Sequence, residues 1–252
     1  MFLLINFTGL IIGSFLNVCI YRIPKGESIV YPPSHCMSCN TRLKAFDLIP
    51  VFSYLLNKGR CRYCGERISL QYPFIELLNG LIYLLLFYKF GLSFNLIKYL
   101  FLTSLLIVIS VIDYKHQIIP DSILLFGFLV ILIFKLLYYS RVELLNSILG
   151  LLIGGLIFSI IVIVSRGGMG GGDIGLIALL GFFFGWKHLL LLMLLSFIIG
   201  AFFSIILLLL KIKSMKDFIP FGPFISIAAI ITIFYGDILI SYYINYFFNY
   251  MG

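Results

Sequence analysis

Apolar runs long enough to cross a lipid bilayer recur from one end of this 252-residue chain to the other. A spanning helix needs about 20 mostly apolar residues, and the chain is 62% hydrophobic with only 11% charged side chains. A water-soluble surface of this size would not tolerate that balance. The sequence therefore predicts an all-α polytopic membrane protein with about eight transmembrane helices.

The runs place the expected spans at residues 2–20, 73–90, 96–112, 122–139, 145–164, 174–186, 188–210 and 221–247. The sixth run is short and the eighth is overlong, so seven or nine spans also fit the pattern. The first run lacks a basic leader and a small-residue cleavage pattern, so we expect it to stay as a helix and not to be a removable signal peptide.

The net charge of +8 is best explained by membrane topology. Lysines and arginines near span ends are retained on the cytoplasmic side, and most of the 18 fall in alternate loops that begin with the loop after the first span. We therefore expect an outside N-terminus and a cytoplasmic first loop. The basic residues could also attract anionic lipid, and we expect no nucleic-acid partner.

Three parts follow from this organisation: a first transmembrane helix at residues 1–20, a small cytoplasmic domain at 21–72, and a helical bundle at 73–252.

Four cysteines of the small domain form two CxxC pairs separated by 21 residues, and this spacing favours a tetrahedral structural zinc site. The expected ligands are Cys36, Cys39, Cys61 and Cys64. Two disulfides are the alternative, which a reducing cytoplasm disfavours. His35 is a weaker alternative ligand, and Cys19 is expected to be a buried core thiol.

Two aspartates stand at span ends that the charge pattern places on the cytoplasmic side. Asp113 closes the third run, and Asp173 opens the sixth after a glycine-rich stretch. Two carboxyl groups in a pocket of low dielectric share a proton, so one can activate water while the other polarises a carbonyl. Helix capping by Asp173 remains an alternative. Asp121, directly after a proline, is expected to be a helix cap, and Glu76 either to partner a cation or to make a hydrogen bond within the bundle. His116 and His188 are isolated in the sequence, and neither is expected to bind a metal.

Several motifs in order resemble one known family, the type IV prepilin leader peptidases, also called prepilin peptidase/N-methyltransferases. The resemblance covers nearly the whole chain. The motifs are Gly13 to Asn17 with Arg22 to Pro24, the two cysteine pairs, Ile49 to Ser53, Gly59 to Cys64, Ile68 to Glu76, Ile112 and Asp113 with Ile119 to Asp121, the GxGD motif within Gly168 to Asp173, and Phe221 to Pro223.

The resemblance implies that Asp113 and Asp173 are the catalytic pair of an aspartic endopeptidase in a bacterial inner membrane. Its substrates would be type IV prepilins or pseudopilins, cut at the cytoplasmic face after the glycine that ends a short basic leader. It also implies N-methylation of the new N-terminus with S-adenosylmethionine, for which Gly59 and Arg60 are the matching positions.

The sequence departs from the family pattern at four positions, which are Met37, Arg60, Lys115 and Gly175. The family often has proline, lysine, an acid and lysine there, respectively. At Arg60 the charge is kept, but a guanidinium is not geometrically equivalent to an ammonium. No glycine fingerprint of a nucleotide-binding crossover is present, so methylation rests on the resemblance alone.

Two other classes of protein compete with a peptidase. Intramembrane acids and broken helices also mark proton- or ion-coupled transporters, although the acids here gather at one face and the predicted spans have few polar groups at mid-membrane. A membrane scaffold that uses the cysteine domain to dock a partner would leave the aspartates unexplained.

Overall fold

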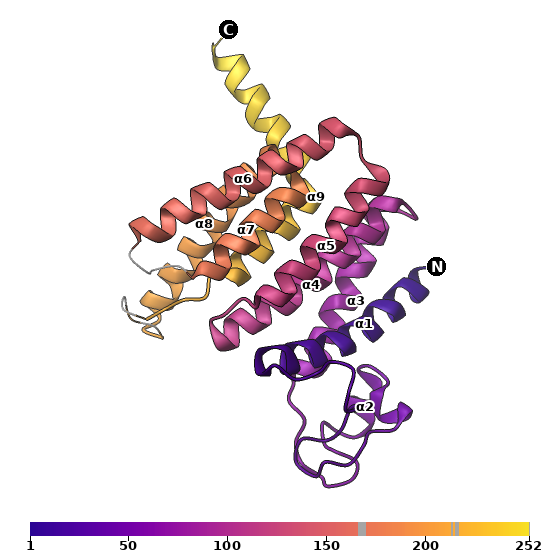
Figure 1. The fold of residues 1–252 in the computed structure, drawn as a ribbon. Coiled ribbons are helices and arrows are strands. Elements are labelled where there is room, and N and C mark those ends of the chain that lie inside the picture. Colours follow the sequence, from indigo (N-terminus) through magenta and orange to yellow (C-terminus); the bar gives the residue numbers. More distant parts are fainter. Residues whose placement is uncertain (166–169, 213, 215–216, 252) are drawn as a thin grey trace. The chain divides into compact units, whose positions relative to one another are not determined.

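The computed structural model describes residues 1–165, 170–212, 214 and 217–251. The helices are α1 (Phe2–Arg22), η1 (Ile23–Lys25), η2 (Ala45–Leu48), α2 (Phe52–Leu56), α3 (Gln71–Phe90), α4 (Phe94–His116), α5 (Asp121–Tyr138), α6 (Arg141–Val164), α7 (Gly171–Phe184), α8 (Trp186–Leu209) and α9 (Gly222–Met251) (Figure 1). The described part of the chain has no strand beyond two isolated bridges. The all-α prediction is therefore confirmed.

Eight apolar helices lie at the eight expected places. Seven of them, in the described residues, are long and apolar enough to cross a membrane, and α7 is the short one. Its 14 residues extend about 21 Å, less than the ~30 Å of a bilayer's hydrocarbon. The polytopic membrane class is thus confirmed. The overlong last run is one helix that continues through Gly236 and Asp237.

The chain divides into two compact units, Met1–Val108 and Ile109–Gly252, hereafter unit 1 and unit 2. In unit 1, α1 and α3 approach closely through glycines, as small residues permit in membrane helices. A methyl group on Gly9 would lie 2.8 Å from the Cα atom of Gly80, and one on Gly13 would lie 2.7 Å from that of Glu76. Asn79 locks this contact by donating to the carbonyl of Gly9 at 2.7 Å.

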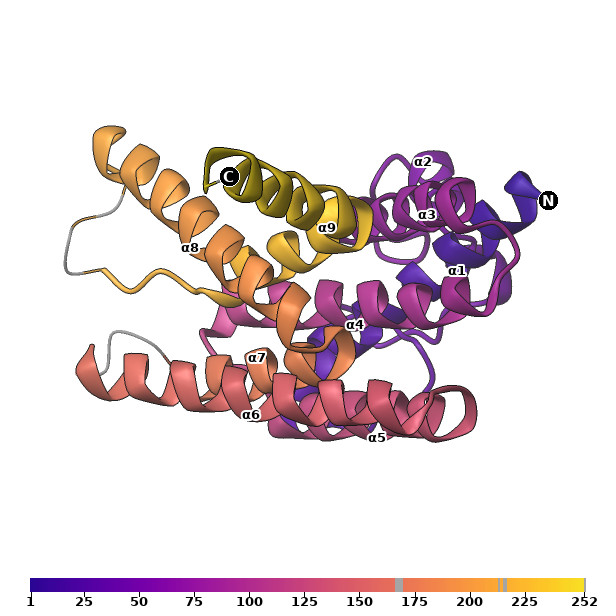
Figure 2. The same cartoon turned by 90° about the horizontal axis from the view of Figure 1, so that it is seen from above.

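In unit 2, α6 runs alongside α7, and α8 packs against α9 (Figure 2). Gly150 and Gly181 let the backbones of α6 and α7 meet, since a methyl group on either would collide with the other's carbonyl. Between α8 and the start of α9, the rings of Phe197 and Phe221 lie 5.4 Å apart. These contacts hold α7, which carries Asp173, and the start of α9, where Gly222 donates a hydrogen bond to Asp113.

Candidate active site and metal centre

Asp113 lies one turn before the C-terminal end of α4, with only 4% of its surface exposed. Its Oδ2 atom accepts a hydrogen bond of 2.8 Å from the backbone N–H of Gly222, the first residue of α9. A helix N-terminus offers unpaired N–H groups and a favourable dipole to an anion. A methyl group on Gly222 would lie 2.7 Å from this oxygen, so glycine is needed there for the carboxyl group to keep its place.

Asp173 is the third residue of α7 and is also only 4% exposed. Its Oδ2 atom accepts a hydrogen bond of 3.2 Å from the backbone N–H of Gly170. The capping alternative is therefore realised in part, because this bond satisfies the N-cap amide of the helix. Capping uses one oxygen of the carboxyl group, and it does not exclude a second role for the other oxygen.

The two aspartates are 60 positions apart in the sequence, but the start of α7 and the segment after α4 come into contact. Glycines allow this arrangement. A methyl group on Gly172 would lie 2.7 Å from Cβ of Ile119, and one on Gly175 would lie 2.6 Å from Cδ1 of Leu124. The start of α7 thus packs directly on the segment that follows α4. The preceding Gly168 and Met169 of the predicted motif lie outside the described residues.

The four predicted zinc ligands come together in unit 1. The sulfur atoms of Cys36, Cys39, Cys61 and Cys64 all lie within 4.8 Å of one another, and the Sγ atoms of Cys36 and Cys64 are 3.8 Å apart. A tetrahedron with Zn–S bonds of 2.3 Å has sulfur–sulfur edges of about 3.8 Å, so the cluster has the right size. No disulfide joins any of the five cysteines. His35 is not part of the cluster, and its Nδ1 atom lies 3.0 Å from the carbonyl oxygen of Pro33.

The two cysteine turns have the same local structure. The backbone N–H of Cys36 donates to the carbonyl of Thr41, and that of Cys61 donates to the carbonyl of Glu66. Each turn contains a left-handed residue directly after its second cysteine, Asn40 in the first and Gly65 in the second. Asparagine and glycine are the residue types that adopt this conformation at least cost. Local sequence therefore shapes both turns.

The pKa values of the cluster's thiols are shifted in opposite directions. The hydroxyl and backbone N–H of Thr41 lower the pKa of the Cys39 thiol to about 6. The backbone N–H of Glu66 lowers the pKa of Cys64, but burial and the neighbouring sulfurs outweigh it and raise this pKa to about 12. Four thiolates this close repel one another, and a divalent ion at their centre would remove the repulsion.

The positions expected for methyl transfer lie beside the same domain. Arg60 lines a cavity of about 370 Å³ in unit 1. Gly59 has a φ of +69°, and a methyl group there would lie 2.7 Å from the hydroxyl oxygen of Tyr54, which also lines the cavity. The structure thus brings Arg60 and Tyr54 to one cavity and puts Gly59 behind the tyrosine ring.

The structure also gives contacts for three other residues that the sequence singles out. Asp121 begins α5, but its side chain makes no capping bond, since Pro120 is the N-cap residue. Glu76 accepts a hydrogen bond of 2.8 Å from the backbone N–H of Val51. His188 had no obvious partner in the sequence, yet its Nε2 atom lies 2.9 Å from a carboxyl oxygen of Asp237, 49 residues away.

Comparison with known proteins decides the family. Residues 7–90 match the bacterial peptidase A24 N-terminal domain, and residues 100–205 match the type IV leader peptidase family. The prepilin leader peptidase/N-methyltransferase of Bacillus subtilis (strain 168) is 37% identical over 237 residues, 94% of this chain and 95% of that protein. The protein of the same name from Pseudomonas putida is 34% identical over 91% of this chain and 88% of its own. The chain belongs to the type IV leader peptidase family. No solved structure gave a significant match.

Family membership confirms the predicted class of enzyme, a peptidase with N-methyltransferase activity, in a multi-pass membrane protein. It disfavours the transporter and scaffold alternatives. The structure also gives a reason for one departure from the family pattern. A lysine at position 175 would put its Cβ atom 2.6 Å from Cδ1 of Leu124, so the leucine side chain, which packs against glycine here, would have to shift.

Proposed function

We propose that this leader peptidase is an aspartic endopeptidase with Asp113 and Asp173 as its catalytic pair. The supporting observation is that two buried carboxyl groups, each held by one backbone N–H group, belong to parts of unit 2 that pack together, since the start of α7 contacts the segment after α4. In this role the pair shares one proton. The ionised carboxylate takes a proton from a water molecule as that water attacks the scissile carbonyl carbon, and the protonated carboxyl group donates a hydrogen bond to the carbonyl oxygen.

The substrates we propose are type IV prepilins or pseudopilins, cut after the glycine that ends a basic leader. A basic leader stays in the cytoplasm while the following apolar helix lies in the bilayer. The excess of lysine and arginine in alternate loops supports a cytoplasmic position for residues 21–72 and for both aspartates, although Arg166, Lys213 and Lys216 of that pattern lie outside the described residues. The membrane would be the bacterial inner membrane, and its lipid the remaining partner.

We further propose that the enzyme methylates the new N-terminus with S-adenosylmethionine. S-adenosylmethionine would supply an electrophilic methyl group to the new N-terminal amine, and Arg60 and Tyr54, which line the cavity beside the cysteine turns, would help to hold it. Both relatives described above are prepilin leader peptidase/N-methyltransferases, which supports this second activity. The four cysteines would hold a structural zinc ion that folds residues 21–72, a segment too small for a core of its own.

The test of the peptidase proposal is cleavage of a co-expressed prepilin by single variants. Asp113→Asn and Asp173→Asn should each abolish the shortened product, because an amide can neither take up the water proton nor share one with its partner. Asp121→Asn is the matched control, since this exposed aspartate stands at the start of α5 and should be replaceable. Cleavage at the wild-type level by either of the first two variants would refute the assignment.

A further inference from the structure

The short helix α2 (Phe52–Leu56) carries an apolar face that the described residues leave largely uncovered. Its outward residues Phe52, Leu55 and Leu56 are 58%, 64% and 81% exposed. They stand at positions i, i+3 and i+4, the spacing that puts side chains on one side of a helix. One exposed leucine needs no explanation, but three large apolar side chains on one face indicate a contact surface.

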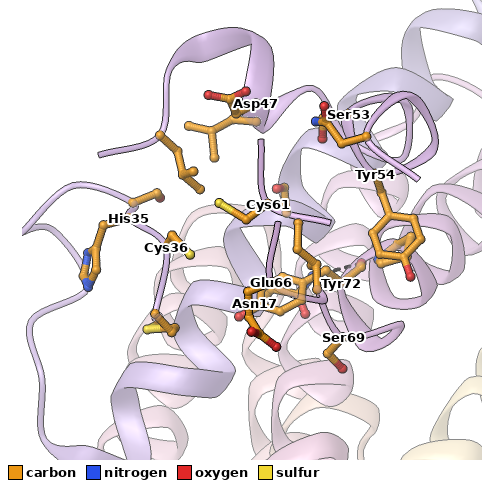
Figure 3. Close-up of a pocket in the computed structure, with 18 of the residues that line it drawn as sticks. Asn17, His35, Cys36, Asp47, Ser53, Tyr54, Cys61, Glu66, Ser69 and Tyr72 are labelled. Carbon is orange, nitrogen blue, oxygen red and sulfur yellow. Dashed lines mark hydrogen bonds between the residues drawn. The ribbon is translucent and has the colours of Figure 1, made fainter. Parts of the chain in front are cut away.

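The other side of α2 belongs to the interior of the domain. Ser53, Tyr54 and the C-cap residue Asn57 line the cavity of about 370 Å³ in unit 1. Figure 3 shows Ser53 and Tyr54 among the side chains of its wall. The helix therefore has two distinct sides, since one builds a cavity wall from polar and aromatic groups and the other is apolar and exposed.

A hydrogen bond attaches the start of α2 to the membrane helix α3. The backbone N–H of Val51, the N-cap residue of α2, donates to Oε2 of Glu76 at 2.8 Å. Glu76 is the sixth residue of α3 and is buried. Helical side chains lean toward the N-terminus of their own helix, so this bond places Val51 level with the first two turns of α3. Those turns open a helix that is long and apolar enough to cross a membrane.

The backbone at Val51 holds this attachment against a conformational cost. Its φ is +63°, a value that is strained for a β-branched residue. Such conformations persist where the surrounding contacts over-determine them. The bond to Glu76 is one such contact, and the bond of 3.0 Å from the Leu55 N–H to the Val51 carbonyl is another. The level of α2 beside α3 is therefore fixed by the fold.

The exposed side chains around α2 match a membrane surface. Phe74 lies in the first turn of α3 and is exposed, and such a side chain on a spanning helix meets lipid. Lys44 and Lys58 are exposed on either side of the apolar segment. Lysines that flank apolar side chains are typical of segments lying on a bilayer, because the ammonium group reaches the anionic head groups. The apolar face and its flanks therefore fit a lipid surface.

We propose that α2 lies on the bilayer surface beside the N-terminal end of α3, with Phe52, Leu55 and Leu56 inserted into that leaflet. Three side chains of a five-residue helix are too few for a second copy of the chain, since a stable interface buries about 800 Å² on each partner. Lipid contact then steadies one wall of the cavity, because Ser53 and Tyr54 stand on the same helix. The inference depends on the membrane class of the protein and on neither proposed activity.

Tryptophan fluorescence can report this lipid contact. The chain has a single tryptophan, Trp186, so Trp186→Phe gives a background without emission from indole. In that background Leu56→Trp puts the reporter on the apolar face of α2, and Arg42→Trp puts it at an exposed position of the first cysteine turn as the matched control. The full-length variants are reconstituted in vesicles of phosphatidylcholine and phosphatidylglycerol, with and without bromine on the lipid chains. Size-exclusion chromatography of the same samples reports folding and oligomeric state.

Brominated lipid should quench most of the Leu56→Trp emission, which should also lie at a shorter wavelength than that of Arg42→Trp. Phe52→Trp, on the same face, is a second reporter and should behave alike. Leu55→Glu added to Leu56→Trp should lower the quenching by lipid, because a carboxylate is costly among lipid chains. Equal quenching of Leu56→Trp, Phe52→Trp and Arg42→Trp by brominated lipid would overturn the proposal. Short-wavelength emission that lipid does not quench, together with a dimer in chromatography, would overturn it in favour of a second copy.

Discussion

Replacement of Gly222 by alanine is the sharpest probe of the aspartate site, because the change adds one carbon atom at a known place. The new Cβ atom would lie 2.7 Å from Oδ2 of Asp113, so the carboxyl group would have to retreat by about 0.7 Å to reach ordinary contact. The 2.8 Å hydrogen bond from the Gly222 N–H would then lengthen to about 3.5 Å, where little of it remains.

A hydrogen bond to a charged group is worth about 1.5–3 kcal/mol. If that bond positions the carboxylate during hydrolysis, its loss corresponds to a fall of about 10- to 150-fold in the rate. The assay is the initial rate of prepilin cleavage by purified enzyme in detergent, normalised to folded protein.

Gly171→Ala is the matched control for this variant. Gly171 lies two residues before Asp173, at the variable position of the GxGD motif, and a methyl group there meets nothing within 4 Å. It should cleave at the wild-type rate. If Gly222→Ala cleaves equally fast, the bond between α9 and Asp113 does not position the carboxyl group for catalysis, and the geometry proposed for the pair is wrong.

Two further predictions concern unit 1. Cys36→Ser or Cys61→Ser should lower both the zinc content, measured by atomic emission, and the yield of folded protein. A variant that lacks the metal but folds with unchanged yield would contradict a structural role for zinc. Gly59→Ala should reduce N-methylation of the mature pilin in mass spectra by about tenfold, because alanine is strained at a φ of +69° and its methyl group would also press on Tyr54. Methylation at the wild-type level in this variant would mean that the backbone at Gly59 does not matter for methyl transfer.

Much of the fold was readable from hydrophobicity alone. The helices fall where the apolar runs are, because any helix of that length and polarity must be buried in lipid or protein. The start of α6 was missed by four residues, since the predicted span began at residue 145 and the helix begins at Arg141. Ser140 and Glu143 form a capping box there, a signal that the sequence displays and that span hydrophobicity ignores.

The cysteine cluster was predictable because both pairs are local and their spacing dictates the turns. The contacts around Asp113 could not be predicted, because the backbone N–H that donates to it belongs to Gly222, 109 positions further along the chain. The same limit hid the pairing of His188 with Asp237. Tyr54 carried no motif of its own, and only its contact with Gly59 and its place in the cavity wall reveal it.

The shortness of α7 has a consequence for water supply. Peptide hydrolysis consumes water, which hydrocarbon excludes, and a helix about 9 Å shorter than the bilayer core forces either local thinning of the membrane or a polar filling at one of its ends. Asp173 stands on the first turn of that helix. If the missing length lies at the Asp173 end of α7, the mismatch between helix and bilayer would give water a route to the carboxyl group. The thickness of the surrounding lipid would then regulate the enzyme.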